Sequence, residues 1–194
     1  VYRDKYYRLK NELQNNHEPE ILLKLNSQFF PKPKDYGKTF MELDFLGKPI
    51  GPPMISLRNP SKSVKISGDL ILSALNWLKE VKLYLKKNKI SHNDIHMGNI
   101  LYNNVLNQFT LIDFSFATFE NKTGINYNKD LKNKSIPYLD DSFSIDLISN
   151  LLIQKLVFEY LKVNKIEENH TTEEIYNYLN KDENLNFNNK KLNY

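Results

Sequence analysis

Two short runs of β-forming residues with polar side chains at their ends constrain the fold of this chain more than any other feature. The runs, Asn99–Tyr102 and Phe109–Ile112, are separated by a polar loop, a pattern that predicts a β-hairpin. Asp94 and Asn99 lie on the approach to the first strand, and Asp113 directly follows the second. Because a hairpin brings its two ends together, we expect two carboxylates and one amide to converge on one site.

These three polar side chains suggest a site for a hard cation. Magnesium binds through one or two carboxylates together with substrate phosphates, and it keeps several of its waters. Asp94, Asn99 and Asp113 could instead be simple turn residues, because Asp and Asn favour turns. Taken singly, each residue is best explained that way, but their joint spacing, together with His92, favours a site.

Two long apolar segments, Asp69–Lys87 and Phe143–Leu161, predict the helices that form the core. Both carry apolar residues at helical spacing. In the first segment these residues occupy so much of the circumference that we expect the helix to be buried on several sides. We expect the second segment to lie at the centre of the core.

The residues before these helices predict a smaller, mixed region. Tyr6–Leu25 has helical spacing but contains Pro19, which is tolerated in a first turn, so a new helix can start near Glu18. Lys38–Leu43 predicts a strand, and Gly47–Pro53 predicts a turn or loop. The fold class expected is therefore α+β, with a small mixed lobe followed by a mainly helical one.

Near the carboxyl end, Thr171 and Glu174 form a capping-box pattern that predicts a further helix. The tail from Lys181, rich in Asn and Lys, is predicted to be disordered. At the other end, Val1–Lys5 is neither a signal peptide nor an initiator methionine, so we expect the sequence to begin inside a domain.

Composition narrows the classes of function. The 194 residues include no cysteine, which excludes disulfides and thiol chemistry and makes a reducing cytoplasm the natural compartment. The net charge is +4, but the 27 basic residues are scattered among 23 acidic ones, so we expect no nucleic-acid partner. No apolar run approaches the roughly 20 residues that cross a bilayer, so we expect no membrane span.

The sequence His92-x-Asp94-x-x-x-x-Asn99, followed by Asp113-Phe114-Ser115, resembles the catalytic loop and the Asp-Phe-Gly motif of the protein-kinase-like superfamily. Its form is most similar to the atypical branch, which contains RIO-like kinases, aminoglycoside and choline phosphotransferases and lipopolysaccharide core kinases. The resemblance covers most of residues 1 to about 160. It implies a bilobal fold: a partial amino-terminal lobe and hinge over residues 1–47, a carboxyl-terminal lobe over 48–180, and a tail over 181–194.

The resemblance also implies roles for the loop residues. Asp94, Asn99 and Asp113 would be catalytic: Asp94 would accept or orient the proton of the substrate hydroxyl, and the other two would hold Mg²⁺ against the phosphates of ATP. Positioning and charge neutralisation make up most of such catalysis. His92 is expected to be structural, packing the loop and donating to backbone. His96 is expected either to hydrogen-bond within the loop or to contact substrate or phosphate.

Further matches concern the nucleotide. Thr39–Ile50 resembles the strand and hinge that receive adenine, with Met41, Glu42 and Leu43 as the expected contacts. Ile112, in the apolar lead-in to the Asp-Phe motif, is expected to contact the cofactor as well.

Two acidic residues resemble supporting groups of the family. Glu18, a better match than Glu20, would pair with the ATP-binding lysine, and Asp141 would brace the backbone of the catalytic loop. However, no glycine-rich loop precedes the helix that is expected to start near Glu18, and no lysine stands in a convincing strand ahead of that helix. Either Arg3 occupies the lysine position or the lysine lies upstream of Val1.

Two further departures concern the segment after Ile112. Ser115 replaces the glycine of the motif, which removes backbone freedom at that turn. The absence of an Ala-Pro-Glu sequence between Ala117 and Asp141 argues against a conventional Ser/Thr/Tyr protein kinase.

The function expected is therefore transfer of the γ-phosphoryl group of ATP, with Mg²⁺, to a hydroxyl of a protein or of a sugar or other small molecule. The alternative is a pseudokinase, a nucleotide-binding or scaffolding module without phosphotransfer.

Overall fold

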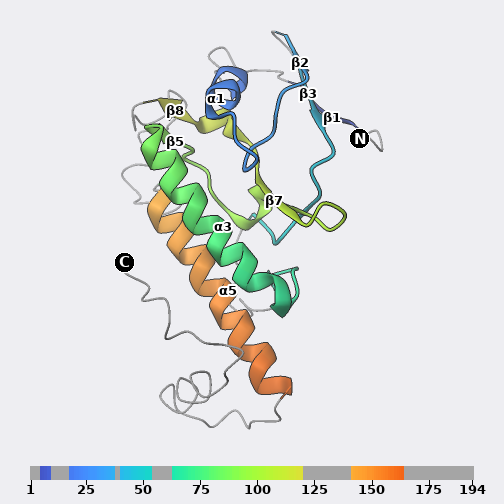
Figure 1. Cartoon of the computed structure of the whole chain (residues 1–194), viewed down its shortest axis with the longest axis vertical. Coiled ribbons are helices and arrows are strands. Elements are labelled where there is room, and N and C mark those ends of the chain that lie inside the picture. Colours follow the sequence, from blue (N-terminus) through green and yellow to red (C-terminus); the bar gives the residue numbers. More distant parts are fainter. Residues whose placement is uncertain (1–4, 10–17, 38–39, 54–62, 120–140, 164–194) are drawn as a thin grey trace.

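The computed structural model describes residues 5–9, 18–37, 40–53, 63–119 and 141–163. Two long helices and three small sheets make up a mixed α+β architecture (Figure 1). In chain order the elements are β1 (Lys5–Leu9), α1 (Glu18–Leu25), β2 (Asp35–Tyr36), β3 (Phe40–Asp44), β4 (Lys48–Pro49), α3 (Gly68–Lys87), β5 (Ile90–Ser91), the 3-10 turn η1 (Met97–Asn99), β6 (Ile100–Asn103), β7 (Gln108–Leu111), the 3-10 turn η2 (Phe114–Phe116), β8 (Thr118–Phe119) and α5 (Asp141–Val163).

Helices α3 and α5 lie side by side and run in opposite directions (Figure 1). Their bounds confirm the two predicted helices to within two residues at each end. Ile71 and Leu78 of α3 and Leu152 of α5 are almost completely buried. Lys82 and Asp146 join the two helices at the surface, with Nζ 2.7 Å from Oδ1.

The predicted hairpin is confirmed. Strands β6 and β7 pair antiparallel from Ile100 opposite Leu111 to Asn103 opposite Gln108. Its loop is closed by the Asn103 side chain, whose oxygen accepts from the N–H of Val105 at 3.0 Å. Short polar side chains that bond the backbone nearby are typical of such turns.

The prediction that Gly47–Pro53 is only turn or loop was wrong for two residues, because β4 pairs with β6. Pro49 is tolerated there because β4 is an edge strand, where a residue without an N–H costs little. Gly47 turns the chain into this strand with φ +115°, and a side chain at that position would collide with the carbonyl oxygen of Tyr102. The turn therefore requires glycine.

The prediction of a helix over Tyr6–Leu25 was wrong for its first part. Lys5–Leu9 is strand β1, which pairs antiparallel with β3 over five residues in a sheet of order β1-β3-β2. A strand that begins with Lys5 thus precedes α1, contrary to expectation, while Arg3 lies outside the described residues. The restart of the helix is confirmed: α1 begins at Glu18, with Pro19 in its first turn.

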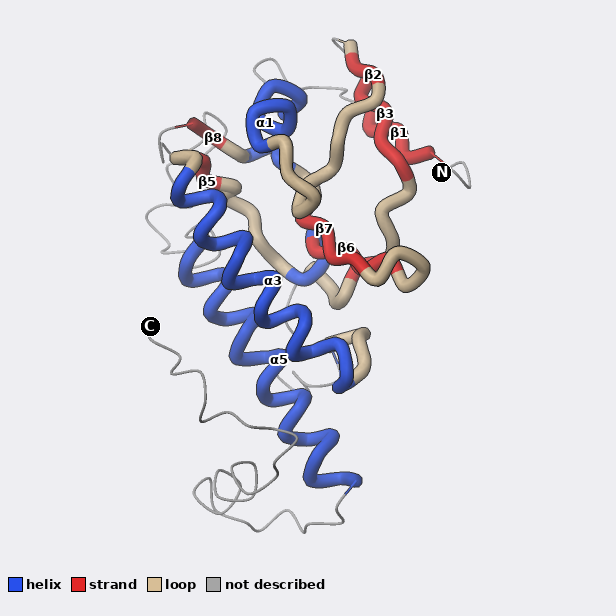
Figure 2. Tube along the Cα trace, in the orientation of Figure 1, coloured by secondary structure: helices blue, strands red, loops and turns tan. Residues whose placement is uncertain are grey.

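The connection from α1 to β2 attaches the small mixed region to the rest (Figure 2). The N–H of Leu111, in β7, donates to the carbonyl of Phe29 at 2.9 Å. The hydroxyl of Tyr84, in α3, donates to the carbonyl of Leu25. Phe30 packs edge-on against Phe114, with ring centroids 5.4 Å apart. These contacts hold α1 over the end of the hairpin.

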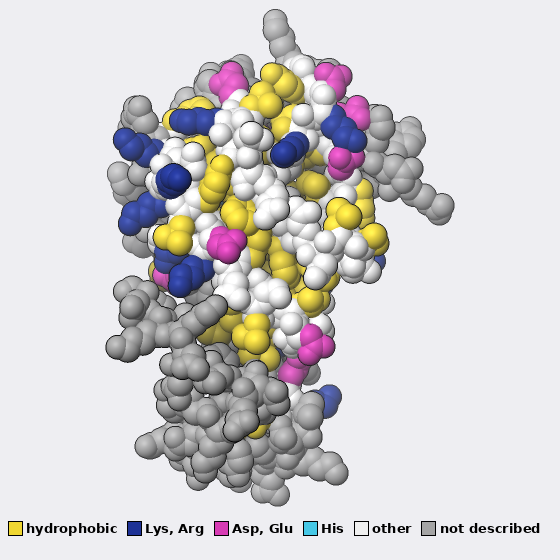
Figure 3. Space-filling view, in the orientation of Figure 1, with side chains coloured by type: hydrophobic (Ala, Val, Ile, Leu, Met, Phe, Trp, Pro, Cys, Tyr) yellow, Lys and Arg dark blue, Asp and Glu magenta, His cyan; other side chains and the backbone are white. Residues whose placement is uncertain are grey.

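On the face drawn in Figure 3, basic side chains gather on the side where α3 ends and α1 lies, among uncharged and hydrophobic ones. Lys86 and Lys87 occupy the last turn of α3, where cations interact favourably with the helix dipole. Within the described ranges, none of the helices is long and apolar enough to cross a membrane. The helix predicted after Thr171 and the tail from Lys181 lie outside the described residues.

Candidate active site

His92 organises the loop between β5 and η1 from inside. Its side chain is completely buried and packs against Phe114, with ring centroids 4.5 Å apart. Nδ1 accepts from the N–H of Asp94 at 3.2 Å, so Nε2 carries the proton and donates to the carbonyl of Ile112 at 2.9 Å. The structural role predicted for His92 is confirmed.

Asp94 and Asn99 are in direct contact. The side-chain nitrogen of Asn99 donates to the carbonyl oxygen of Asp94 at 2.9 Å and to its carboxylate Oδ2 at 3.2 Å. Asn99 is buried and ends the turn η1, where its N–H donates to the carbonyl of His96 at 2.9 Å. Because the amide nitrogen holds Asp94, the amide oxygen is the atom of Asn99 that could serve as a metal ligand.

Asp113 is brought beside this pair by the backbone. The N–H of Ile112 donates to the carbonyl of Asn99 at 2.9 Å, and the carbonyl of Ile112 accepts from His92. Asp113 is the next residue, so the three segments that carry Asp94, Asn99 and Asp113 meet at one end of the hairpin, as predicted from the hairpin geometry.

Ser115 does not strain the turn that follows. Asp113, rather than Ser115, has the left-handed backbone, with φ +69°. The hydroxyl of Ser115 donates to Asp113 Oδ1 at 2.6 Å, and its N–H reaches the same atom at 3.4 Å. The backbone freedom that glycine would give is therefore not required at Ser115, whose side chain orients the Asp113 carboxylate.

Glu18 reaches the Asp-Phe turn from α1. It is 2% exposed, and its Oε1 accepts from the N–H of Phe114 at 2.9 Å, whereas Glu20 is exposed. Of the two glutamates, Glu18 is therefore the one that faces inward. Its pairing with an ATP-binding lysine stays a prediction.

Asp141 holds the backbone of the loop from the start of α5. Its two carboxylate oxygens accept from the N–H groups of His92 at 2.7 Å and of Asn93 at 2.9 Å. The predicted bracing of the catalytic loop by Asp141 is confirmed. Negative charge at the first residue of a helix also interacts favourably with the helix dipole.

The residues expected to contact the nucleotide are only partly accessible. Met41 and Leu43, in β3, are 1% and 3% exposed and belong to the core, while Glu42 and Ile112 are half-buried. The carbonyl of Glu42 accepts from the N–H of Lys34 at 2.9 Å. Their role in holding a cofactor stays a prediction.

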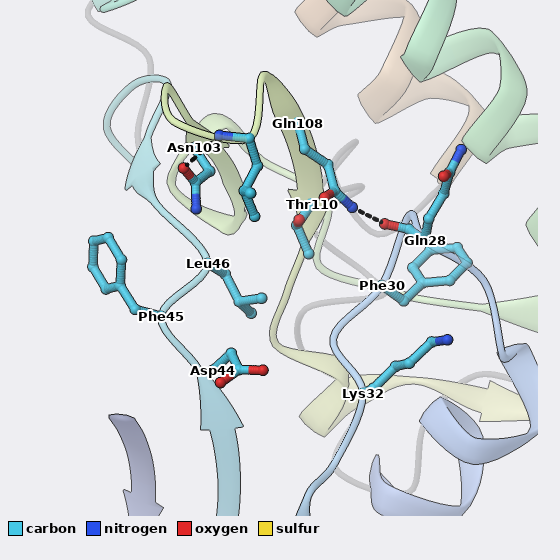
Figure 4. A pocket seen from close by; sticks show the side chains of 10 residues that line it. Gln28, Phe30, Lys32, Asp44, Phe45, Leu46, Asn103, Gln108 and Thr110 are labelled. Atoms are coloured by element: carbon cyan, nitrogen blue, oxygen red, sulfur yellow. Dashed lines mark hydrogen bonds between the residues drawn. The ribbon is translucent and has the colours of Figure 1, made fainter. Parts of the chain in front are cut away.

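A pocket of about 570 Å³ adjoins this segment (Figure 4). It lies between the β3–β4 connection, the β6–β7 hairpin and the α1–β2 connection, and none of the predicted site residues lines it. Its lining includes Asp44, which directly follows Leu43, and Thr110, which lies two residues before Ile112. Three of its lining residues, Asp44, Phe45 and Leu46, belong to the segment Thr39–Ile50 that resembles the hinge. Sequence reasoning missed the other seven: Gln28, Phe30, Lys32, Asn103, Leu106, Gln108 and Thr110.

The oxygen atoms near the meeting point suit a cation whose coordination shell is completed by phosphate groups. In the part of the chain that the structure describes, no three His, Asp or Glu side chains form a group that could hold a metal ion alone. The three predicted site residues bring the carboxylates of Asp94 and Asp113 and the amide oxygen of Asn99 to the meeting point as oxygen donors. This donor set fits Mg²⁺, which takes one or two protein oxygens and completes its shell with phosphates and water.

Comparisons with known proteins add little to this geometry. No family model and no curated protein matches the chain. Among solved structures, the chain is similar to the PK-1 kinase of the Cydia pomonella granulovirus, with 16% sequence identity and a TM-score of 0.43. That similarity covers 59% of this chain and only 42% of the viral one.

Proposed function

We propose that this chain is an ATP-dependent phosphotransferase of the protein-kinase-like type, closest in its loop to the atypical branch. It transfers the γ-phosphoryl group of ATP to a hydroxyl of a protein or of a sugar or other small molecule. Residues 1–47 form the partial amino-terminal lobe and hinge, and residues 48–180 form the carboxyl-terminal lobe.

The observation that carries this proposal is the hydrogen-bonded meeting of the loop and the hairpin. Asn99 holds Asp94 through its amide, and Ile112 bonds both His92 and Asn99 one residue before Asp113. This arrangement supplies a carboxylate to orient an acceptor hydroxyl and, separately, oxygen ligands for a phosphate-bound cation.

The proposed division of labour follows from the contacts. Asp94 orients the acceptor hydroxyl and takes its proton as the acceptor oxygen bonds to the γ-phosphorus and the bond from that phosphorus to the departing ADP breaks. Asp113, aligned by Ser115, and the amide oxygen of Asn99 would hold Mg²⁺, which would supply neutralisation of the phosphate charge. Since phosphoryl transfer needs little covalent help, this positioning accounts for most of the catalysis.

The test compares ATP·Mg²⁺ binding with turnover. At about one hundred times its Kd, ATP·Mg²⁺ should stabilise the wild type by about 2.7 kcal/mol in a thermal-shift assay. We expect Asp113→Asn to lose this shift, because the metal ligand is lost. We expect Asp94→Asn to keep it while ADP formation with hydroxyl acceptors falls by roughly 10²–10⁴-fold.

Asp69→Asn, an exposed carboxylate at the start of α3, serves as the control and should behave as the wild type. The absence of any shift in the wild type would contradict the proposal. A wild type that binds ATP·Mg²⁺ but transfers no phosphoryl group to any acceptor would instead favour the pseudokinase.

A further inference from the structure

Asn93, between His92 and Asp94, has an unusual backbone and a buried side chain. Its φ is +64°, in the left-handed region that Asn adopts more readily than most residues, and it is 6% exposed. The backbone therefore restricts this position to a few residue types. It does not explain why a buried amide is present rather than glycine.

The amide of Asn93 bonds to the segment that follows Asp113. Its nitrogen donates to the carbonyl of Phe116 at 2.9 Å and to the hydroxyl of Thr118 at 3.2 Å, with the carbonyl of Ser91 at 3.4 Å. Ser91 and Thr118 are also opposite each other where β5 pairs with β8. One side chain thus joins the loop before β6 to the strand after η2.

Asn93 is also the point where other supports of the site meet. Its own N–H donates to Asp141 at 2.9 Å. Asp94 is its neighbour in the chain, and Asp113 lies three residues before Phe116. The bonds from Asn93 to Phe116 and Thr118 therefore link the residue before Asp94 to the segment that follows Asp113.

We propose that Asn93 is a positioning residue, which sets the placement of Asp94 relative to Asp113 by tying the loop to Phe116–Thr118. This inference rests on the proposed phosphotransferase function. The amide of Asn93 is neutral, and so are the carbonyl and the hydroxyl that accept its hydrogen bonds. The contact therefore forms without a charged group, such as a phosphate, on the segment after Asp113. Such a contact is little affected by ionic strength, which screens charges rather than neutral groups.

The test removes the amide while it keeps the backbone conformation. In Asn93→Gly, glycine adopts φ +64° freely, so the backbone keeps its conformation while the side-chain bonds and the small volume of the buried amide are lost. We expect kcat for phosphoryl transfer to fall about 100-fold, the size of effect that a misplacement of about 1 Å produces. The affinity for ATP·Mg²⁺ should change less than about 3-fold, because Asn99 and Asp113 remain.

A second variant attacks the same contact from the other strand. Thr118→Val keeps the branched shape and removes the hydroxyl, and its effect on kcat should be smaller and not additive with that of Asn93→Gly. The matched control is Asn88→Ala, at the carboxyl-terminal cap of α3, which removes an amide bond from Nδ2 to the carbonyl of Tyr84 at 2.9 Å that does not involve the segment after Asp113. It should leave kcat unchanged.

Amide hydrogen exchange gives a readout that does not depend on activity. Asn93→Gly should speed exchange at residues 116–119 and leave the core of α3 protected. Unchanged exchange there would overturn the tie itself, and wild-type kcat in a folded Asn93→Gly would overturn its role in positioning. A wild type that neither binds nor turns over ATP contradicts the proposed function and removes the catalytic part of this inference, whereas the exchange result still decides the structural part.

Discussion

The two histidines of the loop, His92 and His96, differ in burial and in hydrogen bonding. His92 is completely buried and bonds through both ring nitrogens. His96 is 23% exposed, and its Nε2 lies 3.7 Å from Asp94 Oδ2, too far for a hydrogen bond. The ring of His96 instead packs against Gly98, where a side chain would approach within 3.0 Å of it. One histidine therefore supports the fold, and the other borders the site.

This difference predicts opposite phenotypes for the two alanine variants. His92→Ala leaves the carbonyl of Ile112 and the N–H of Asp94 buried without partners and opens a cavity beside Phe114. We expect it to lower the free energy of unfolding by about 3 kcal/mol. His96→Ala should cost less than about 1 kcal/mol. Urea unfolding of both variants checks this, and equal losses would contradict the assigned contacts.

For single residues, the sequence predicted structural contacts correctly where the resemblance itself implied the bonding partner. His92 and Asp141 bond as the resemblance suggested, and Glu18 faces inward. The sequence does not show that Asp113, rather than Ser115, takes the positive φ of the turn. Asn93 was missed for a different reason, because its acceptors, Phe116 and Thr118, come close only after β5 pairs with β8.

Among the elements, α5 contributes to the site through its first residue, Asp141. Asp141 accepts two charge-assisted hydrogen bonds from the loop backbone, whereas Asp146, one turn later, bonds only to the half-exposed Lys82. Bonds to a charged acceptor contribute more than neutral ones, about 1.5–3 kcal/mol each. The start of α5 therefore determines the shape of the loop as well as its own packing.

We accordingly predict that Asp141→Ala lowers the free energy of unfolding by about 3 kcal/mol and reduces phosphoryl transfer. Both losses have one cause, because the N–H groups of His92 and Asn93 lose their acceptors. Asp146→Asn, in the same helix, should stay within about 0.5 kcal/mol of the wild type, as expected for a surface ion pair. Chemical denaturation of the two variants measures the difference. Similar stability for both would show that the loop does not depend on α5.

The elements that the sequence predicted correctly are those with a strong local pattern of apolar and polar residues. The helices α3 and α5 have long periodic patterns, and the β6–β7 hairpin has two apolar runs around a polar loop. Strand β1 was mistaken for helix because five residues carry a weak period, and its partner β3 lies about thirty residues further on. Pairing of this kind overrides local propensity. Strand β4 was missed for the same reason, since only β6 makes it a strand.

Across the whole molecule, one hydrophobic core joins the small mixed region to the helical one. Buried side chains run without interruption from Ile21, Leu22 and Leu25 of α1 to Leu152 of α5. The hydrogen bonds of Phe29 with Leu111 and of Glu18 with Phe114 cross the same boundary. A continuous core of this kind predicts that both regions unfold together rather than one after the other.

The single tryptophan allows a direct test of this cooperativity. Trp77 lies in α3, is 8% exposed and packs near Phe109, so its fluorescence reports on the helical region. Leu22→Ala deletes a side chain in α1 that is 2% exposed and should cost about 3 kcal/mol. If unfolding is two-state, the urea midpoint must fall equally by Trp77 fluorescence and by far-ultraviolet circular dichroism. Leu23→Ala, its 49% exposed neighbour, should leave both midpoints almost unchanged. A fluorescence midpoint that stays at the wild-type value in Leu22→Ala would mean that α1 unfolds separately, and that Glu18 reaches the Asp-Phe turn without stabilising the helices beneath it.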